Sequence, residues 1–242
     1  MSLSENHITA TGGLSQVLER HAGSFHRVVP FEPARDRLHL FDFTAANVGL
    51  STDDIADTER FADYINRTLR ARQARYGIGG YAEHRTLYAR SRHFGTSEAG
   101  EPRRLHLGAD IWGPAGTPVM APLEGIVHSF AFNNNESDYG ATIVLTHQLD
   151  GAIFHTLYGH LSLNSLKNLD EGRRVSAGEV IAEFGMRFEN GNWPPHLHFQ
   201  LISDMQGWKG DYPGVCRYSE RDTWLENCPD PEPILRMTRY AN

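Results

Sequence analysis

Two histidines separated by one residue, His196 and His198, have the spacing that points most directly to chemistry in this sequence. The stretch from His196 to Leu201 alternates polar and apolar residues, which is typical of a half-buried strand. Side chains two positions apart on a strand point to the same face, so His196, His198 and Gln200 share one face. Two imidazoles side by side on a polar face indicate a metal site or a proton-transfer site.

A second polar pair lies about 90 residues earlier, in a segment that we predict to be a strand over residues 105–111. On such a strand His106, Gly108 and Asp110 share one face. A glycine between the two polar groups leaves space for an ion or a substrate backbone to approach closely. Two histidines and one carboxylate are a known ligand set of catalytic zinc, which keeps a fourth position for water. His106, Asp110 and one histidine of the later pair would complete that set.

A further histidine, His160, follows a glycine at the end of a predicted strand over residues 152–159. At a strand end the side chain can project over a cleft. Taken alone, His160 would be explained as a loop histidine, and His106 with Asp110 as a surface ion pair. The two-histidine strand further along the chain favours a common site over both simpler explanations.

Three motifs occur in a fixed order: His106-x-Gly108-x-Asp110, Tyr158-Gly159-His160-Leu161-Ser162 and His196-Leu197-His198-Phe199. Together they resemble the LytM/lysostaphin-type zinc metallopeptidases, a family of peptidoglycan endopeptidases. The resemblance covers about residues 101–203. It implies that His106, Asp110 and His198 are the ligands of one Zn²⁺ per chain, and that His160 and His196 are catalytic residues that do not bind the metal.

The chemistry implied by the resemblance suits these residue types. Bound Zn²⁺ lowers the pKa of its water from ~15.7 toward ~7 and polarises the scissile carbonyl. The sequence has no His-Glu-x-x-His motif, so no glutamate on a helix is available as the base. Histidine can fill that role because its pKa lies near working pH. His160 and His196 are therefore assigned jointly to water activation and oxyanion stabilisation, with the division between them left open.

The prediction is a zinc metalloendopeptidase, a hydrolase acting on a peptide or peptidoglycan-derived substrate. The sequence departs from the family in the bulky loop Asn190–Pro195, in Gln200 where an acid is common, and in the lack of an export signal. A catalytically silent member that binds peptides or cell-wall fragments is the alternative. A lipoyl-type carrier domain is disfavoured, because Lys167, the one lysine between residues 105 and 200, is not in a hairpin context.

The elements that must position these residues are short strands separated by Gly, Pro, Asn and Asp. We predict a mainly β fold, an antiparallel β-sandwich or partly open barrel forming the metallopeptidase core, with an N-terminal α+β extension. The expected parts are an extension over residues 1–100, a candidate cover of the cleft, a β domain over 101–203 and an irregular tail over 204–242. The predicted strands are 118–121, 125–132, 141–147, 152–159, 174–176, 179–184 and 196–202.

In the extension, helical spacing predicts a helix from Leu14 to His21, and extended structure over residues 38–43. A capping box, Ser51 with Asp54, opens a long predicted helix whose apolar stripe runs to Leu69. The glycine-rich segment 77–80 has neither a preceding strand nor a Gly-Lys-Ser/Thr ending, so we predict a hinge or turn and not a phosphate loop.

The net charge of −7 argues against a nucleic-acid surface that depends on bulk positive charge. Cys216 and Cys228 are not in a CxxC pair, so two ordinary thiols are expected, with a single disulfide as the alternative. No apolar run approaches the ~20 residues that span a bilayer. Residues 1–7 lack the basic and apolar regions of a signal peptide, which favours a cytoplasmic location, with export the alternative if a leader was removed. The sequence leaves the oligomeric state open.

Overall fold

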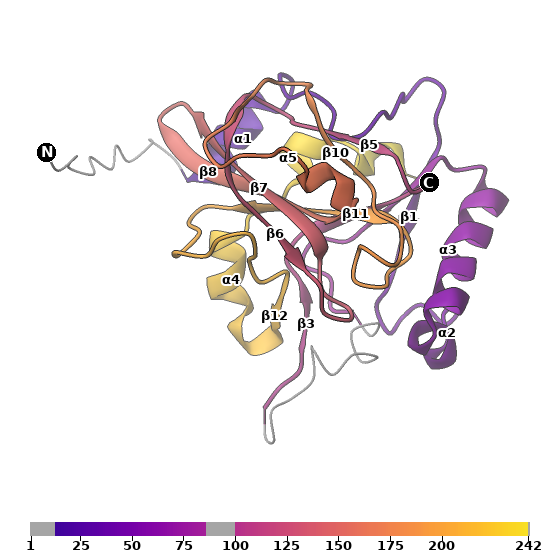
Figure 1. Cartoon of the computed structure of the whole chain (residues 1–242). Helices are drawn as coiled ribbons and strands as arrows, with labels where there is room; N and C mark the ends of the chain where they lie inside the picture. The colour runs from indigo at the N-terminus through magenta and orange to yellow at the C-terminus, as the bar shows by residue number, and fades with distance from the viewer. Residues whose placement is uncertain (1–12, 86–99, 242) are drawn as a thin grey trace, which may run out of the picture.

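An eight-stranded sheet forms the centre of the computed structural model, which describes residues 13–85 and 100–241 (Figure 1). Among the described strands, every neighbouring pair of this sheet is antiparallel except the first two, which are parallel. In spatial order the strands are β1 (Leu38–Phe41), β2 (Tyr76–Gly79), β4 (Ala109–Trp112), β11 (His196–Ile202), β8 (Ala152–Leu161), β7 (Gly140–Leu149), β6 (Gly125–Asn133) and β9 (Arg174–Val175).

Two short sheets accompany the large one. β10 (Val180–Glu183) pairs with β5 (Pro118–Met120), and β12 (Val215–Arg217) pairs with β3 (Arg103–His106). The mainly β class is confirmed, and every strand predicted from residue 118 onward has a counterpart within a few residues of its expected ends. The predicted sandwich or partly open barrel fits the architecture only loosely, because the large sheet is open and ends in edge strands β1 and β9.

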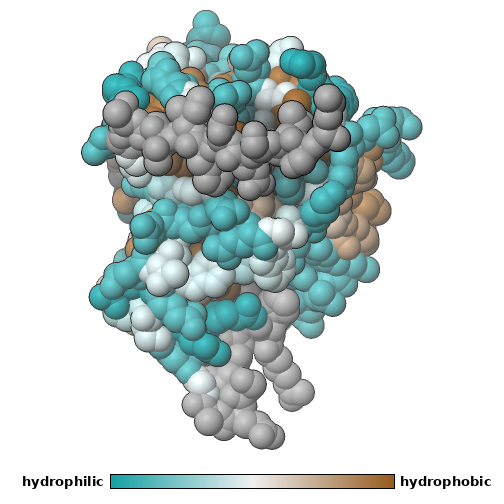
Figure 2. Space-filling view, turned by 90° about the vertical axis from the view of Figure 1, so that its left-hand side faces the viewer, coloured by the Kyte–Doolittle hydropathy of each residue, from teal (hydrophilic) through white to brown (hydrophobic). Residues whose placement is uncertain are grey.

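The helices lie mainly before and after the strand-rich region of the chain. In Figure 1 the early helices are indigo to purple, and the late helices are yellow. They are α1 (Leu14–His21), α2 (Thr52–Ala56), α3 (Thr58–Arg72), α4 (Arg221–Asn227) and α5 (Glu232–Leu235), with short 3₁₀ turns η3 (Leu163–Leu166), η4 (Tyr218–Glu220) and η5 (Thr238–Tyr240). No described helix is long and apolar enough to cross a membrane. The face shown in Figure 2 is mostly hydrophilic, with hydrophobic residues in smaller groups.

The long helix expected after Ser51 is two helices. The capping box of Ser51 and Asp54 is present and begins α2. Asp57 then leaves the helical conformation, and its side chain accepts hydrogen bonds from the backbone N–H groups of Glu59 and Arg60, which begins α3. The apolar stripe was therefore predicted correctly, but a second N-cap inside it divides the helix.

The glycine-rich segment 77–80 is not the hinge that we predicted, because most of it belongs to the buried strand β2. A Cβ atom at Gly77 would collide with the ring of Phe41 on β1. Glycine is used here for close packing between strands and not for flexibility. Since β2 pairs with β4, the expected boundary near residue 100 falls between neighbouring strands of one sheet. The division into three parts stays a prediction. Residues 1–12, on which the prediction about a signal peptide rests, and residues 86–99 lie outside the described residues.

An aromatic cluster joins α3 to the sheet beneath the polar face of β4. Phe43, Phe61 and Trp112 pack edge to face, with ring centroids 5.6–5.7 Å apart. Each of these side chains is buried, and burial of one Phe stabilises the fold by about 1.5–3 kcal/mol. This packing fixes β4, which carries Asp110. Cys216 and Cys228 are free, buried thiols, as expected.

Candidate metal centre and cleft

Three predicted ligands, His106, Asp110 and His198, meet at one point. His106 Nε2 lies 2.9 Å from His198 Nδ1, and His198 Nδ1 lies 3.1 Å from Asp110 Oδ1. His106 Nε2 and Asp110 Oδ1 are 3.3 Å apart. All three residues are buried, and their side chains form a group that could hold a metal ion.

Strand pairing brings these residues together. β4 and β11 are neighbours in the large sheet, and their register places His198 directly opposite Asp110. His106 is the last residue of β3, which belongs to a different sheet. The single strand that we predicted over residues 105–111 is therefore two strands, with a break at Leu107 and Gly108.

Gly108 provides space at this break, and the ring of His198 lies against it. A Cβ atom at Gly108 would lie 2.7 Å from Cε1 and Nε2 of the His198 ring and 2.8 Å from the carbonyl oxygen of Phe199. The absence of a side chain therefore allows the His198 ring to lie against the backbone beside His106.

The outer nitrogens of both histidines are hydrogen-bonded, which fixes the inner nitrogens as acceptors. His106 Nδ1 donates to the carbonyl oxygen of Gly80, at 3.0 Å. His198 Nε2 lies 2.8 Å from Gln200 Oε1, and Gln200 Nε2 donates to the carbonyl oxygen of Pro213 at 3.1 Å. The second bond sets the orientation of the amide, so Gln200 Oε1 accepts and His198 Nε2 donates. In the neutral form of each ring, the inner nitrogen carries a lone pair that faces Asp110 Oδ1.

A buried ion pair holds the second oxygen of the carboxylate. Arg85 Nη1 donates to Asp110 Oδ2, and Arg85 Nε donates to Glu83 Oε2 at 2.6 Å. Burial alone would raise the pKa of Asp110, but His106 and Arg85 outweigh it and hold that pKa well below its usual value. Burial and the charge of Arg85 lower the pKa of His106 to about 4. At neutral pH the site therefore presents a carboxylate and neutral imidazole, the forms that bind metals.

The remaining two predicted histidines, His160 and His196, lie together beside this centre. Their ring centroids are 4.1 Å apart, and both rings line the cleft. His160 Nδ1 donates to the carbonyl oxygen of Asn190 at 2.9 Å, and His196 Nδ1 donates to that of Pro194 at 2.8 Å. Burial is the main cause that lowers the pKa of both, to about 4 for His196. Each histidine is thus neutral, with its Nε2 free of a hydrogen and able to accept a proton.

The loop Asn190–Pro195, which we predicted to be bulky, orients both of these histidines. Asn190 is fully buried, and its side-chain amide donates to the carbonyl oxygens of Gly185 and Trp193. Its own carbonyl oxygen accepts from His160, as described above. His160 adopts a left-handed backbone conformation (φ 62°), which is uncommon in a non-glycine residue, and its side-chain bond to Asn190 and its backbone N–H bond to the carbonyl oxygen of Tyr139 hold it there.

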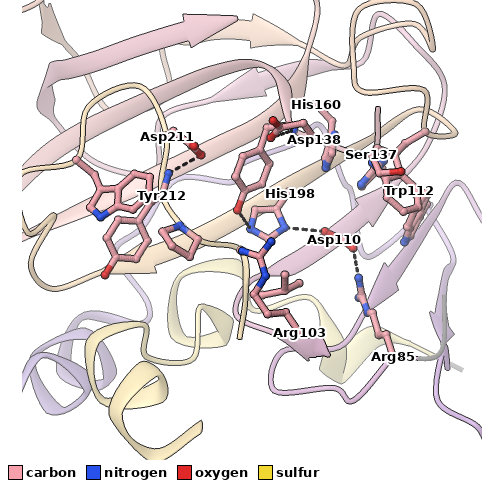
Figure 3. Close-up of a pocket in the computed structure, with 17 residues that line it drawn as sticks. Arg85, Arg103, Asp110, Trp112, Ser137, Asp138, His160, His198, Asp211 and Tyr212 are labelled. Atoms are coloured by element: carbon pink, nitrogen blue, oxygen red, sulfur yellow. Dashed lines mark hydrogen bonds and ion pairs between the residues drawn. The ribbon is translucent and has the colours of Figure 1, made fainter. Parts of the chain in front are cut away.

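An open cleft with about 850 Å³ of free space lies over the centre (Figure 3). Asp110, His160, His196 and His198 line it together with aromatic side chains. Trp112 stacks on His196, with ring centroids 3.9 Å apart and an interplanar angle of 14°. The aromatic residues of the wall are Trp112, Tyr139, Trp193, Trp208 and Tyr212. The arrangement can hold a cation at the floor of the cleft and present two neutral histidines beside it.

Sequence reasoning missed Arg85 and the carbonyl of Gly80. Both belong to the segment that we predicted to be a hinge and its continuation, and no motif marked them. The density of functional groups in residues 81–85 was the one available signal. Gln200 was noticed as a difference from the family pattern, but its bond to His198 was not predicted. His84 in the same segment contacts the ring of Tyr218 edge to face.

Residues 104–209 match a family model described as Peptidase family M23. A DD-carboxypeptidase/endopeptidase Mpg of Neisseria meningitidis serogroup B is 37% identical over 97 residues, which are 40% of this chain and 20% of that protein. An L-Ala–D-Glu endopeptidase of Bacillus subtilis is 26% identical over 125 residues, covering 50% of this chain and 36% of that protein. The matched region therefore spans about a fifth to a third of the length of these relatives. The catalytic domain of the antimicrobial peptidase lysostaphin from Staphylococcus simulans is 26% identical with a TM-score of 0.41, over 72% of this chain and 97% of that domain.

Proposed function

We propose that this chain, whose residues 104–209 match the model of peptidase family M23, is a zinc-dependent metalloendopeptidase that hydrolyses an amide bond in peptidoglycan peptides. The observation that carries the proposal is the convergence of His106 Nε2, Asp110 Oδ1 and His198 Nδ1 within 3.3 Å of one another. His160 and His196 lie next to that point, at the floor of the same cleft.

The donor set fits zinc. Three acceptor atoms that face one another at about 3 Å repel unless a cation lies between them. Tetrahedral zinc with bonds of about 2.0–2.1 Å separates its ligand atoms by about 3.3 Å, close to the distances found here. Histidine nitrogen and carboxylate oxygen are both zinc ligands, and a set of two histidines and one carboxylate leaves a fourth position for a reactant. The bonds from His106 to Gly80 and from His198 to Gln200 are the outer contacts that fix such ligands.

Bound zinc would supply a water of lowered pKa and would polarise the scissile carbonyl. The two cleft histidines complete the chemistry. His160 and His196 each hold their Nδ1 hydrogen on a backbone carbonyl, so Nε2 can accept the proton that the attacking water loses. Once protonated, the same nitrogen can donate to the developing oxyanion or to the leaving amine. Trp112, stacked on His196, holds that ring in place and keeps water from one of its faces.

The peptidoglycan substrate is proposed from the relatives, whose names describe endopeptidases and a DD-carboxypeptidase. The cleft supports an extended peptide, since it is open and lined by aromatic side chains on which the faces of peptide groups can pack. Asp138, Asp211 and Arg103 provide charged groups of both signs in the wall of the cleft.

The test combines metal analysis with hydrolysis of purified peptidoglycan, with the released peptides identified by mass spectrometry. The wild-type protein is expected to hold one zinc per chain and to release peptides. His106→Ala and His198→Ala should lose zinc and activity together, because each removes a ligand. His160→Ala and His196→Ala should keep most of the zinc and lose turnover.

Two results would change the proposal. Stoichiometric zinc with no cleavage of peptidoglycan or of any peptide library would favour the alternative, a silent member that binds peptides or wall fragments. Release of zinc by His196→Ala but not by His198→Ala would reverse the roles of the two histidines on β11.

A further inference from the structure

Arg85 is an arginine inside the candidate metal centre, although it lies outside the region that matches the peptidase family. Its side chain is 1% exposed. The guanidinium bridges two carboxylates, since Nη1 donates to Asp110 Oδ2 and Nε donates to Glu83 Oε2 at 2.6 Å. Asp110 and Arg85 are buried and the Glu83 side chain is 10% exposed. Removing the arginine from such a set would leave a buried charge without compensation. An arrangement of this kind requires that the guanidinium and both carboxylates be held in place by the surrounding structure.

The backbone around Arg85 is tied to the strand that carries His106. Arg85 N donates to the carbonyl oxygen of Arg104 at 2.9 Å, and His106 N donates to that of Glu83 at 3.0 Å. The guanidinium lies over the ring of Phe43, with its central carbon 5.3 Å from the ring centroid. Glu83 Oε1 also accepts from the backbone N–H of Phe43 at 3.1 Å. The guanidinium is therefore fixed relative to both β3 and the Phe43 loop.

The two oxygens of Asp110 consequently have different partners. Oδ1 faces His106 and His198, while Oδ2 is occupied by Arg85. Figure 3 shows the contacts of Asp110 with His198 and Arg85. We propose that Arg85 is a positioning residue that keeps Asp110 a one-oxygen metal ligand and so preserves an open coordination position for the reactants. A carboxylate with both oxygens available can bind a metal ion through either one or both of them. The inference rests on the proposed function, because it concerns the same metal centre.

Charge gives Arg85 a second effect. Asp110, Arg85 and Glu83 together carry one net negative charge. Replacing Arg85 by a neutral residue leaves two carboxylates near the metal, which reduces the positive field that acts on water and on the scissile carbonyl. Loss of Arg85 should therefore lower the rate of the chemical step more than it weakens substrate binding.

The test uses the full chain loaded with Co²⁺, whose visible absorption falls in intensity when four-coordination changes to five or six. Arg85→Met removes the charge and both donors, and Arg85→Lys keeps the charge but has one donor group that cannot bridge both carboxylates. Arg75→Met is the matched control, because Arg75 also pairs with an aspartate, Asp36, but on the surface.

In Arg85→Met the absorption of Co²⁺ should decrease, and kcat should fall by about 10–100-fold, the usual range for outer contacts of metal ligands. KM should change by no more than about twofold. Arg85→Lys should recover part of kcat, and Arg75→Met should match the wild type in both measurements. Wild-type absorption and kcat in both Arg85 variants would overturn the inference.

X-ray absorption spectroscopy of the wild-type zinc protein provides a test that does not depend on variants that fold. A single carboxylate oxygen in the zinc shell supports the inference, and two oxygens from Asp110 at equal distance would overturn it. Failure of the proposed function looks different, since the wild-type protein would then bind no stoichiometric zinc or cleave no peptide.

Discussion

Gly108→Ala tests whether the position of the His198 ring depends on the missing side chain at residue 108. The added methyl group would lie 2.7 Å from two atoms of the His198 ring and 2.8 Å from the carbonyl oxygen of Phe199. Favourable carbon contacts lie at about 3.5–4.0 Å, so the ring must retreat by roughly 0.8 Å or more. The carbonyl belongs to β11 and cannot move without disturbing the sheet.

That displacement is larger than a reactive site tolerates, which is about 0.5 Å. A misplacement of about 1 Å costs on the order of 100-fold in rate, or about 2.7 kcal/mol of transition-state stabilisation. We therefore expect kcat/KM for Gly108→Ala to fall about 100-fold. The affinity for zinc, measured by competition with a chromophoric chelator, should fall by at least about tenfold.

Gly125→Ala is the matched control for this substitution. Its added Cβ would lie 2.6 Å from Nδ1 of His147 and 2.7 Å from the carbonyl oxygen of Thr146, a similar collision at another part of the sheet. It should lower the unfolding temperature without changing zinc affinity. Wild-type zinc affinity and kcat/KM in Gly108→Ala would refute the reasoning, as would equal loss of zinc in both variants.

Three further predictions follow, two for the surroundings of the centre and one for a buried histidine outside it. Gln200→Leu removes the acceptor for His198 Nε2, so zinc affinity should fall about 10–100-fold. Gln200→Glu keeps an acceptor oxygen and should retain the affinity. The same chelator competition measures both variants, and equal affinities would argue against a role for the hydrogen bond between His198 and Gln200. Trp112→Phe weakens the stack on His196, so kcat should fall while bound zinc stays stoichiometric, and a loss of zinc instead would show that Trp112 supports the ligands. Burial lowers the pKa of His147, which is remote from the centre, to about 4. Between these pH values the unfolded state therefore binds a proton that the folded state does not bind. The contribution of His147 to the free energy of unfolding declines as pH falls from about 6.5 to about 4, by at most about 1.4 kcal/mol per pH unit. Urea unfolding at pH 7 and pH 5 should show a smaller decline in His147→Gln than in the wild type, and an equal decline in both proteins would contradict the assignment.

Local patterns predicted most strands of the β region, and the three motifs with the family resemblance that they carry singled out the five histidine and carboxylate positions of the candidate site. The alternation of polar and apolar residues around His196 and His198 is a property of neighbouring residues, because a strand repeats every two positions. The same locality explains the correct capping box at Ser51. It also explains two errors, since neither the break at Gly108 nor the second cap at Asp57 changes the local apolar pattern.

The sequence alone therefore singled out the side chains of the candidate site, while the tertiary structure decided how each of them is held. Gly80 and Arg85 reach His106 and Asp110 from a segment without any motif, and Pro213 orients Gln200 from beyond β11. Such contacts join residues that are far apart in the chain, and no local periodicity encodes them. A buried polar atom must find a partner wherever the fold places one. The direction of each candidate ligand consequently depends on contacts between distant parts of the chain.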